Sequence, residues 1–314
     1  MGFANVSLGN SGQGWPFGSD LRSNIRHLRE ARRNDGCAVA CDHDRTDGSR
    51  LPWNTGGLYG GWGGHAYHAT EPGSERTPVV FVHGNQRDAC DWAAHAEFFL
   101  QRSYLGDELW AVSFRDGSPS HPEMAATLED FVHRVCEHAD ADSVSLVAHS
   151  LGVTGARWWM AEYDRYEMVD TFVGLAGANH GTVLTKWAHE AGMRDGTYKM
   201  SEFLRADYDR VEDHPLSRLN ADETPGPVEY YTIRGTEDPL FWGCPESPAL
   251  EGATNLVLET DHDGVRASQQ ARERCYESVA DEHPYDLQNQ VGLPESEAEP
   301  DHASTPDTSA DAEG

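Results

Sequence analysis

A serine at the junction between a short apolar strand and a helix constrains the fold of this chain more than any other feature. Residues 144–148 are mostly apolar, as in a strand buried on both faces of a parallel sheet. The run stops at Ser150, and a helical pattern follows over residues 151–161. Ala148 and Gly152 flank the serine where a larger side chain would collide across a tight turn. The segment therefore predicts a nucleophile elbow; the alternative is a serine that only caps a core helix.

Strand and helix patterns alternate along the rest of the chain. Further strands are expected at residues 77–84, 108–114, 168–176, 228–234 and 255–259, and helices at residues 21–31, 124–137 and 265–279. This alternation implies an α/β fold with a mostly parallel central sheet and helices on both faces.

Composition divides the chain into three parts. Residues 1–74 are rich in glycine and polar residues, so we expect an irregular N-terminal extension that includes a glycine-rich loop at residues 56–64. The α/β domain follows over residues 75–284. Its mixed segment at residues 177–227 is placed where a cap is expected. Residues 285–314 cannot bury a core, and we expect an acidic, disordered tail.

The charge balance excludes some classes of partner. The chain has 53 acidic and 24 basic residues, a net charge of −29. Removing the seven acids after Pro294 still leaves an excess of 22 negative charges, so the excess runs through the whole chain. Nucleic acid and anionic membranes are therefore poor partners. Such a composition resembles that of proteins from salt-loving archaea and predicts adaptation to high salt, where counterions screen the self-repulsion.

The absence of some sequence patterns bears on the localisation and the cofactors that we expect. We find neither an apolar stretch long enough to span a bilayer nor an export signal in residues 1–33, and we expect a cytoplasmic protein. In a protein of this size the six cysteines are expected to be mainly free thiols. A metal site at Cys37 and Cys41 is the weaker alternative, because no second pair has zinc-ligand spacing. We predict no metal or organic cofactor, and the oligomeric state stays open.

A serine nucleophile needs a base, and the base needs an acid to orient it. In elbow-type hydrolases these residues follow in the order serine, acid, histidine. The strand at residues 228–234 is followed by Glu237 and Asp238, of which Asp238 is the preferred acid. The last strand is followed by His262, the predicted base.

The oxyanion hole requires two backbone N–H groups aimed at the position where negative charge develops. One is expected from Leu151, which follows the nucleophile at a helix N-terminus. The other is expected from Asn85, because His83 and Gly84 precede it in the loop after the first core strand.

Three segments together carry a family resemblance. Residues 79–85 (VVFVHGN), 147–152 (VAHSLG) and 174–181 (GLAGANHG) resemble the bacterial class 2 lipases, which are α/β-hydrolase esterases. The glycine-rich segment at residues 59–64 also resembles lipase-like polyhydroxyalkanoate depolymerases. The resemblance covers about residues 58–279 and implies an α/β-hydrolase fold. It also implies Ser150, Asp238 and His262 as catalytic triad and Asn85 and Leu151 as oxyanion donors.

The sequence therefore predicts a serine hydrolase that cleaves carboxylic esters of lipid or polyester type through an acyl-enzyme. The same triad could serve a thioesterase, an acyltransferase or an amidase, and a non-catalytic binding module is the alternative outside enzymes. Aromatic residues could line an acyl pocket, although core packing is the more common role of such residues. They are Trp92, Trp158, Trp159, Trp187 and Phe203.

Overall fold

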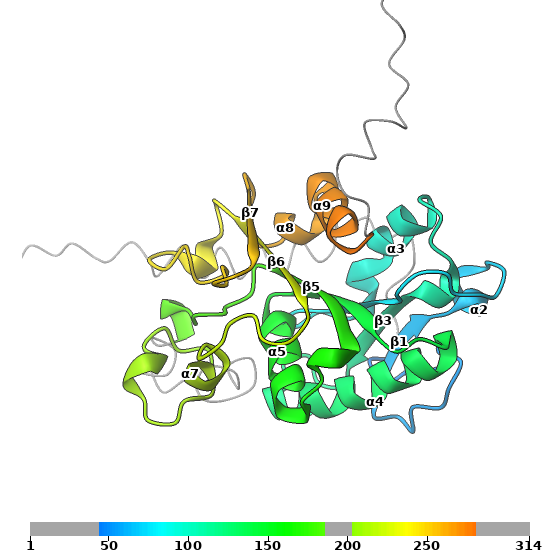
Figure 1. The fold of residues 1–314 in the computed structure, drawn as a ribbon, viewed down its shortest axis with the longest axis horizontal. Helices are drawn as coiled ribbons and strands as arrows, with labels where there is room; N and C mark the ends of the chain where they lie inside the picture. The colour runs from blue at the N-terminus through cyan, green and yellow to red at the C-terminus, as the bar shows by residue number, and fades with distance from the viewer. Residues whose placement is uncertain (1–43, 186–202, 281–314) are drawn as a thin grey trace, which may run out of the picture.

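The computed structural model describes residues 44–185 and 203–280, and one seven-stranded sheet runs through them (Figure 1). The strands are β1 (Tyr59–Gly63), β2 (Val79–Val82), β3 (Leu109–Phe114), β4 (Val144–His149), β5 (Val169–Leu175), β6 (Glu229–Gly235) and β7 (Thr254–Leu258). Their order across the sheet is β1-β3-β2-β4-β5-β6-β7. Only the pair β1–β3 is antiparallel. The carboxyl ends of β2 to β7 therefore meet at one edge of the sheet.

Helices cover both faces of the sheet, as predicted. The α-helices are α2 (His65–His68), α3 (Ala93–Leu100), α4 (His121–Ala139), α5 (Leu151–Tyr163), α7 (Pro215–Leu219), α8 (Gly264–Ala267) and α9 (Gln269–Val279). Short 3₁₀ turns include η1 (Ala89–Trp92), η2 (Gly106–Glu108), η3 (Tyr166–Met168), η5 (Tyr208–Arg210) and η6 (Pro239–Phe241). Figure 1 shows α4 and α5 on one face of the sheet and α3, α8 and α9 on the other.

Two apolar layers result from the alternation of side chains along the strands. In β2, Val80 and Val82 face the layer formed with α4 and α5, whereas Val79 and Phe81 face the layer formed with α3 and α9. All four residues of β2 are fully buried. Burial on both faces explains why the central strands have continuous apolar sequences.

The glycine-rich segment predicted as a loop contains an edge strand, so that prediction is wrong. Residues 59–63 form β1, which lies N-terminal to the expected domain boundary at residue 75. A Cβ on Gly61 would lie 2.2 Å from the carbonyl oxygen of Ala111, and one on Gly63 would lie 2.3 Å from the Trp110 ring. The glycines thus allow β1 to approach β3 closely.

The predicted helix at residues 265–279 is divided into α8 and α9. Ser268 separates them with an extended backbone, and its hydroxyl accepts a hydrogen bond from the Ala271 N–H at 3.1 Å. A serine that caps the following helix in this way stops the preceding one. Helix α3 had no counterpart in the prediction.

Some predictions fall on residues outside the described ranges. They are the helix at residues 21–31, Cys37 and Cys41, Trp187, and the acidic tail at residues 285–314. Within the described ranges, Cys90, Cys136, Cys244 and Cys275 take part in no disulfide, in agreement with the prediction. In the same ranges, none of the helices combines the length and the apolarity required to cross a membrane.

Candidate active site

Ser150 lies in a sharp turn between β4 and α5. Its backbone angles are φ 54° and ψ −120°, outside the left-handed helical region that some non-glycine residues tolerate. The Ser150 N–H donates to the Leu175 carbonyl at 2.8 Å, so β5 holds the turn in place. A Cβ at Gly152 would lie 2.6 Å from the His83 carbonyl oxygen, which explains the small residue there. The predicted elbow geometry is present.

Three side chains from different loops converge on this turn. The Ser150 Oγ lies 2.9 Å from His262 Nε2, and His262 Nδ1 lies 2.7 Å from Asp238 Oδ2. Asp238 follows β6 and His262 follows β7, so the parallel sheet brings both to the edge where β4 ends. The side chain of Asp238 is 1% exposed and that of His262 is 11% exposed. The contacts form one chain of hydrogen bonds from carboxylate to hydroxyl.

The Asp238 carboxylate is fixed by a second contact. Its Oδ1 accepts the Leu240 N–H at 2.9 Å, so it caps η6 while Oδ2 faces the imidazole. Glu237, the alternative acid, is exposed. The structure therefore places Asp238, and not its neighbour, on His262.

His149 contacts the backbone of the loop that carries His262. The sequence analysis did not predict this contact. The His149 Nε2 atom lies 3.0 Å from the His262 carbonyl oxygen, which requires that Nε2 carry the hydrogen. Burial lowers the pKa of His149 well below its usual value. A neutral His149 thus donates to the backbone of His262. Its position directly before the serine was the only sequence signal.

A partly buried ion pair joins the loop after β2 to the loop after β7. The Arg87 guanidinium contacts the Asp263 carboxylate, and the Arg87 side chain is only 9% exposed. Arg266 of α8 donates to the Asp91 carbonyl oxygen at 2.7 Å, which adds a second link between the same regions. The predicted oxyanion loop and the histidine loop are therefore held to each other.

The residues predicted to form the oxyanion hole lie on either side of Ser150. Leu151 is the first residue of α5, where backbone N–H groups have no acceptor within the helix. A Cβ on Gly84 would lie 2.9 Å from the Ser150 Cβ, so the loop that carries Asn85 runs against the serine. The Asn85 side chain is held by the Ser118 hydroxyl at 2.6 Å.

His83 stabilises the same loop from within. Its Nε2 accepts the Phe114 N–H at 3.0 Å and its Nδ1 donates to the Gly84 carbonyl at 2.8 Å. Burial lowers the pKa of His83 to about 4, so the ring stays neutral and keeps this tautomer.

Most of the aromatic residues considered for an acyl pocket belong to the core. Trp92 and Trp159 are fully buried, and Trp158 is 8% exposed. The Phe203 ring stacks on the His121 imidazole and contacts the edge of Trp158. The described aromatics therefore pack mainly against the protein itself.

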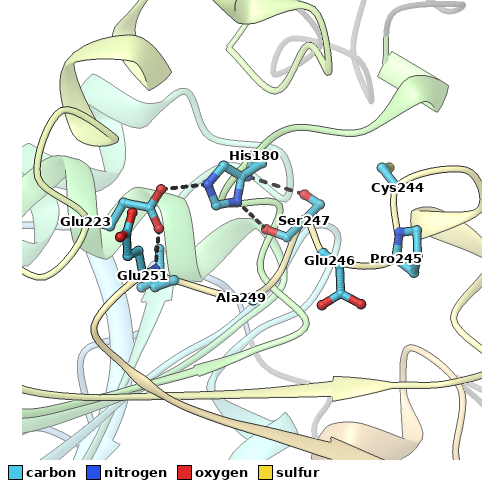
Figure 2. A pocket seen from close by; sticks show the side chains of 9 residues that line it. His180, Glu223, Cys244, Pro245, Glu246, Ser247, Ala249 and Glu251 are labelled. Atoms are coloured by element: carbon cyan, nitrogen blue, oxygen red, sulfur yellow. Dashed lines mark hydrogen bonds and ion pairs between the residues drawn. The ribbon is translucent and has the colours of Figure 1, made fainter.

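A pocket of about 610 Å³ lies between the loops that follow β5 and η6 (Figure 2). His180 is part of its lining. The His180 Nε2 atom lies 2.8 Å from Glu223 Oε1, and Nδ1 lies 3.2 Å from the Ser247 carbonyl oxygen. Its lining does not include Ser150, Asp238 or His262. The pocket is therefore distinct from the three-residue cluster.

Both ends of the segment at residues 177–227 are tied to α5 through Arg157. Its guanidinium donates to Asn179 Oδ1 at 3.2 Å, to the Leu219 carbonyl at 3.0 Å and to Asn220 Oδ1 at 3.1 Å. Asn220 in turn donates to the Asn179 carbonyl at 2.9 Å. Burial lowers the pKa of Arg157 to about 10. This buried network fixes the base of the segment.

Comparison with known proteins bears on the fold and on the segment that contains the elbow. The sequence model of the class 2 lipase family matches residues 76–162, which is less than half of the chain. That match includes β2 and the elbow but neither Asp238 nor His262. The chain thus resembles the class 2 lipases, as the sequence analysis stated.

Two solved structures have the same fold. The Bacillus licheniformis lipase BlEst2 in its propeptide form is 18% identical, with a TM-score of 0.51, over 67% of this chain and 52% of that chain. Aspergillus fumigatus lipase B is 15% identical, with a TM-score of 0.53, over 69% of this chain and 55% of that one. The chain thus spans about half the length of these lipases. It has the α/β-hydrolase fold, as predicted.

Proposed function

We propose that the protein is a serine hydrolase that cleaves carboxylic esters through an acyl-enzyme on Ser150. The observation that carries the proposal is the continuous chain from Asp238 through His262 to the Ser150 hydroxyl, with contacts of 2.7 and 2.9 Å. A strained elbow presents this hydroxyl at the carboxyl edge of an α/β-hydrolase sheet. The resemblance to class 2 lipases over residues 76–162 supports ester chemistry.

Acylation begins when His262 takes the proton of the Ser150 hydroxyl. Ser150 Oγ then forms a bond to the ester carbonyl carbon, and the N–H groups of Leu151 and Asn85 stabilise the oxyanion. The tetrahedral intermediate collapses, the alkoxy oxygen leaves, and His262 gives it the proton. Asp238 keeps the imidazole in the required tautomer and stabilises its charged form.

Deacylation repeats these steps with water as the nucleophile. His262 takes a proton from the water, whose oxygen attacks the acyl carbon. Collapse of the second intermediate breaks the bond to Ser150 Oγ and releases the carboxylic acid, and the proton returns to the serine. The proposed cycle needs no metal ion or organic cofactor.

For the substrate, we propose an acyl ester of lipid or polyester type. The segment at residues 177–227 begins after β5, at the sheet edge where the elbow lies, and ends before β6, which starts at the opposite edge because β5 and β6 are parallel. A segment that begins beside the elbow can act as a cap that selects the acyl group. The Arg157 network supports a fixed base for such a cap.

Labelling with a fluorophosphonate probe tests the nucleophile. The full-length chain in molar KCl should be labelled on the peptide that contains Ser150, and Ser150→Ala should abolish both labelling and hydrolysis of p-nitrophenyl esters. Ser143→Ala is the matched control, because Ser143 lies just before β4, at the opposite end of that strand from Ser150, and this variant should still react. Label on another serine, or ester hydrolysis that survives in Ser150→Ala, would show that the proposal is wrong.

Parallel assays separate the alternative reactions. The wild-type chain is given an oxygen ester, the matching thioester and the matching anilide of one acid. The proposal expects the highest kcat/KM for the oxygen ester. A higher value for the thioester or the anilide would indicate a thioesterase or an amidase, and absence of labelling with all three inert would indicate a binding module.

A further inference from the structure

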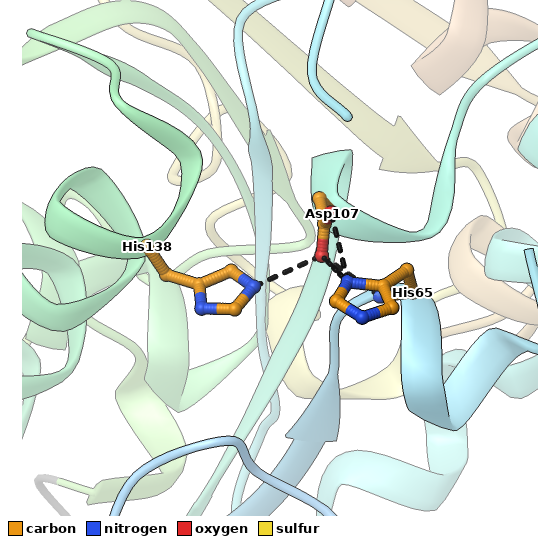
Figure 3. A group of neighbouring side chains, drawn as sticks. All are labelled: His65, Asp107 and His138. Atoms are coloured by element: carbon orange, nitrogen blue, oxygen red, sulfur yellow. Dashed lines mark hydrogen bonds and ion pairs between the residues drawn. The ribbon is translucent and has the colours of Figure 1, made fainter. Parts of the chain in front are cut away.

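Two histidines and an aspartate meet at the amino edge of the sheet, opposite the candidate active site (Figure 3). His65 opens α2 directly after β1, Asp107 lies in η2 just before β3, and His138 lies in the last turn of α4. Three elements that are separate in sequence thus contribute one side chain each. The sequence analysis assigned none of the three a role.

The potential ligand atoms are close together. His65 Nδ1 lies 2.9 Å from Asp107 Oδ1, and His138 Nε2 lies 3.0 Å from the same oxygen. One such atom from each of the three residues lies within 4.8 Å of the others. Figure 3 shows both imidazole rings directed at the carboxylate from different sides.

Three nitrogen atoms lie within hydrogen-bonding distance of Asp107 Oδ1. Besides the two imidazole nitrogens, the His65 backbone N–H lies 2.8 Å away and donates to it. A carboxylate oxygen has two lone pairs in its plane, so three nitrogens compete for them. A cation between the rings and the carboxylate would remove the competition, because each imidazole would then direct a lone pair at the cation.

Backbone N–H groups hold the carboxylate in position. The His65 N–H donates to Oδ1 at 2.8 Å. The Gly73 N–H lies 2.9 Å from Oδ2. Backbone donors that fix a ligating carboxylate in this manner are typical of the second shell of metal sites.

The cluster is also accessible. The Asp107 side chain is 8% exposed, whereas His65 is 37% and His138 25% exposed. A metal ion can therefore approach past the rings and reach a buried anion. The net charge of −29 raises the local concentration of cations around the molecule.

We propose that this cluster is a binding site for one divalent transition-metal ion of the zinc class. His65 Nδ1, His138 Nε2 and one Asp107 oxygen are the protein ligands, and water completes a tetrahedral shell. Two imidazoles with one carboxylate suit Zn²⁺ better than Mg²⁺ or Ca²⁺, which prefer sets made of oxygen alone. The ion would tie β1 and α2 to β3 and α4, so its role is to stabilise the edge of the fold.

The test compares wild type with His65→Ala, His65→Gln, His138→Ala and the control His133→Ala. His133 lies on the same helix as His138, is 50% exposed, and contacts only Glu129 among the ion pairs of the described residues. Each full-length chain is treated with a chelator and dialysed against micromolar Zn²⁺ in the same KCl buffer. Bound zinc is then measured per chain, and thermal unfolding is recorded with and without Zn²⁺.

The proposal expects wild type and His133→Ala to bind one more zinc ion per chain than the His65 and His138 variants, or to bind it at least about tenfold more tightly. It also expects Zn²⁺ to raise the melting temperature of wild type and His133→Ala only. His65→Gln keeps a polar side chain of similar size, so it separates loss of a ligand from loss of structure. Equal zinc content and equal affinity in all five proteins, including the case of no zinc at all, would overturn the proposal.

Discussion

The backbone of Ser150 provides a stability prediction that is independent of any substrate. Its angles of φ 54° and ψ −120° are accessible to glycine but strained for every residue with a Cβ. Such strain costs about 1–3 kcal/mol and persists only where the surrounding structure imposes it. Ser150→Gly should therefore stabilise the fold while it removes the proposed nucleophile.

The comparison that isolates this strain is Ser150→Gly against Ser150→Ala. Both variants lack the hydroxyl and its 2.9 Å contact with His262, so they differ only in the Cβ. Release of about 1–3 kcal/mol of strain is opposed by about 0.4–1 kcal/mol, because glycine has greater freedom in the unfolded chain. The glycine variant should be more stable by about 1 kcal/mol. For a domain of this size, that difference raises the melting temperature by about 2–4 °C.

Thermal and urea unfolding of the two variants in the same molar KCl buffer measure the difference. Ala161→Gly is the control, since Ala161 is exposed in regular α5 and glycine there should destabilise by about 1 kcal/mol. A strained elbow predicts that glycine raises the free energy of unfolding at position 150 and lowers it at position 161. If Ser150→Gly is less stable than Ser150→Ala, as Ala161→Gly is less stable than wild type, the strain argument is refuted.

Three further predictions concern the acid, the salt dependence and one buried histidine, His121. Asp238→Asn should lower kcat by about 10³–10⁴-fold, because the amide N–H would face the imidazole N–H that must donate to an acceptor. Glu237→Gln should change kcat little. Steady-state ester assays measure both effects, and a larger loss for Glu237→Gln would reverse the assignment. The melting temperature should rise steeply with KCl up to molar concentrations, since the Debye length falls from about 30 Å at 0.01 M to about 3 Å at 1 M; a flat or falling curve contradicts the high-salt interpretation. Burial lowers the pKa of His121 to about 3, so only the unfolded chain takes up this proton as the pH falls below about 6.5, and stability falls with it. His121→Gln should reduce the slope of unfolding free energy against pH between pH 6 and 4 by up to about 1.4 kcal/mol per unit in urea titrations, and an unchanged slope would speak against it.

The elements that could be predicted from the sequence are those whose pattern lies within a few consecutive residues. The central strands have continuous apolar runs because both of their faces are buried, and the elbow has small residues beside Ser150 because the turn is tight. Chain order then placed Asp238 and His262 at the correct sheet edge, where the structure brings them within hydrogen-bonding distance of each other and of the serine. Their catalytic roles remain a proposal.

What the sequence could not predict depends on contacts between distant segments. Strand β1 has a glycine-rich sequence of low strand propensity, and its pairing follows from close approach to β3. Arg87 and Asp263 are 176 residues apart, and no periodic pattern links them. The same holds for His65 and His138, which meet only because Asp107 lies between them in space. Long-range polar contacts of this kind have no local signature.

The two ends of the sheet have consequences for how this protein can evolve. Ser150 and its partners lie where the parallel strands end, whereas the cluster around Asp107 lies where β3 begins, about 20 Å away along six residues of strand. Mutations at such a distance with no shared contacts are nearly additive in free energy. Substitutions at the Asp107 end should therefore change the stability of the fold and leave the geometry around Ser150 unchanged. The two ends of the sheet can then vary independently of each other in evolution.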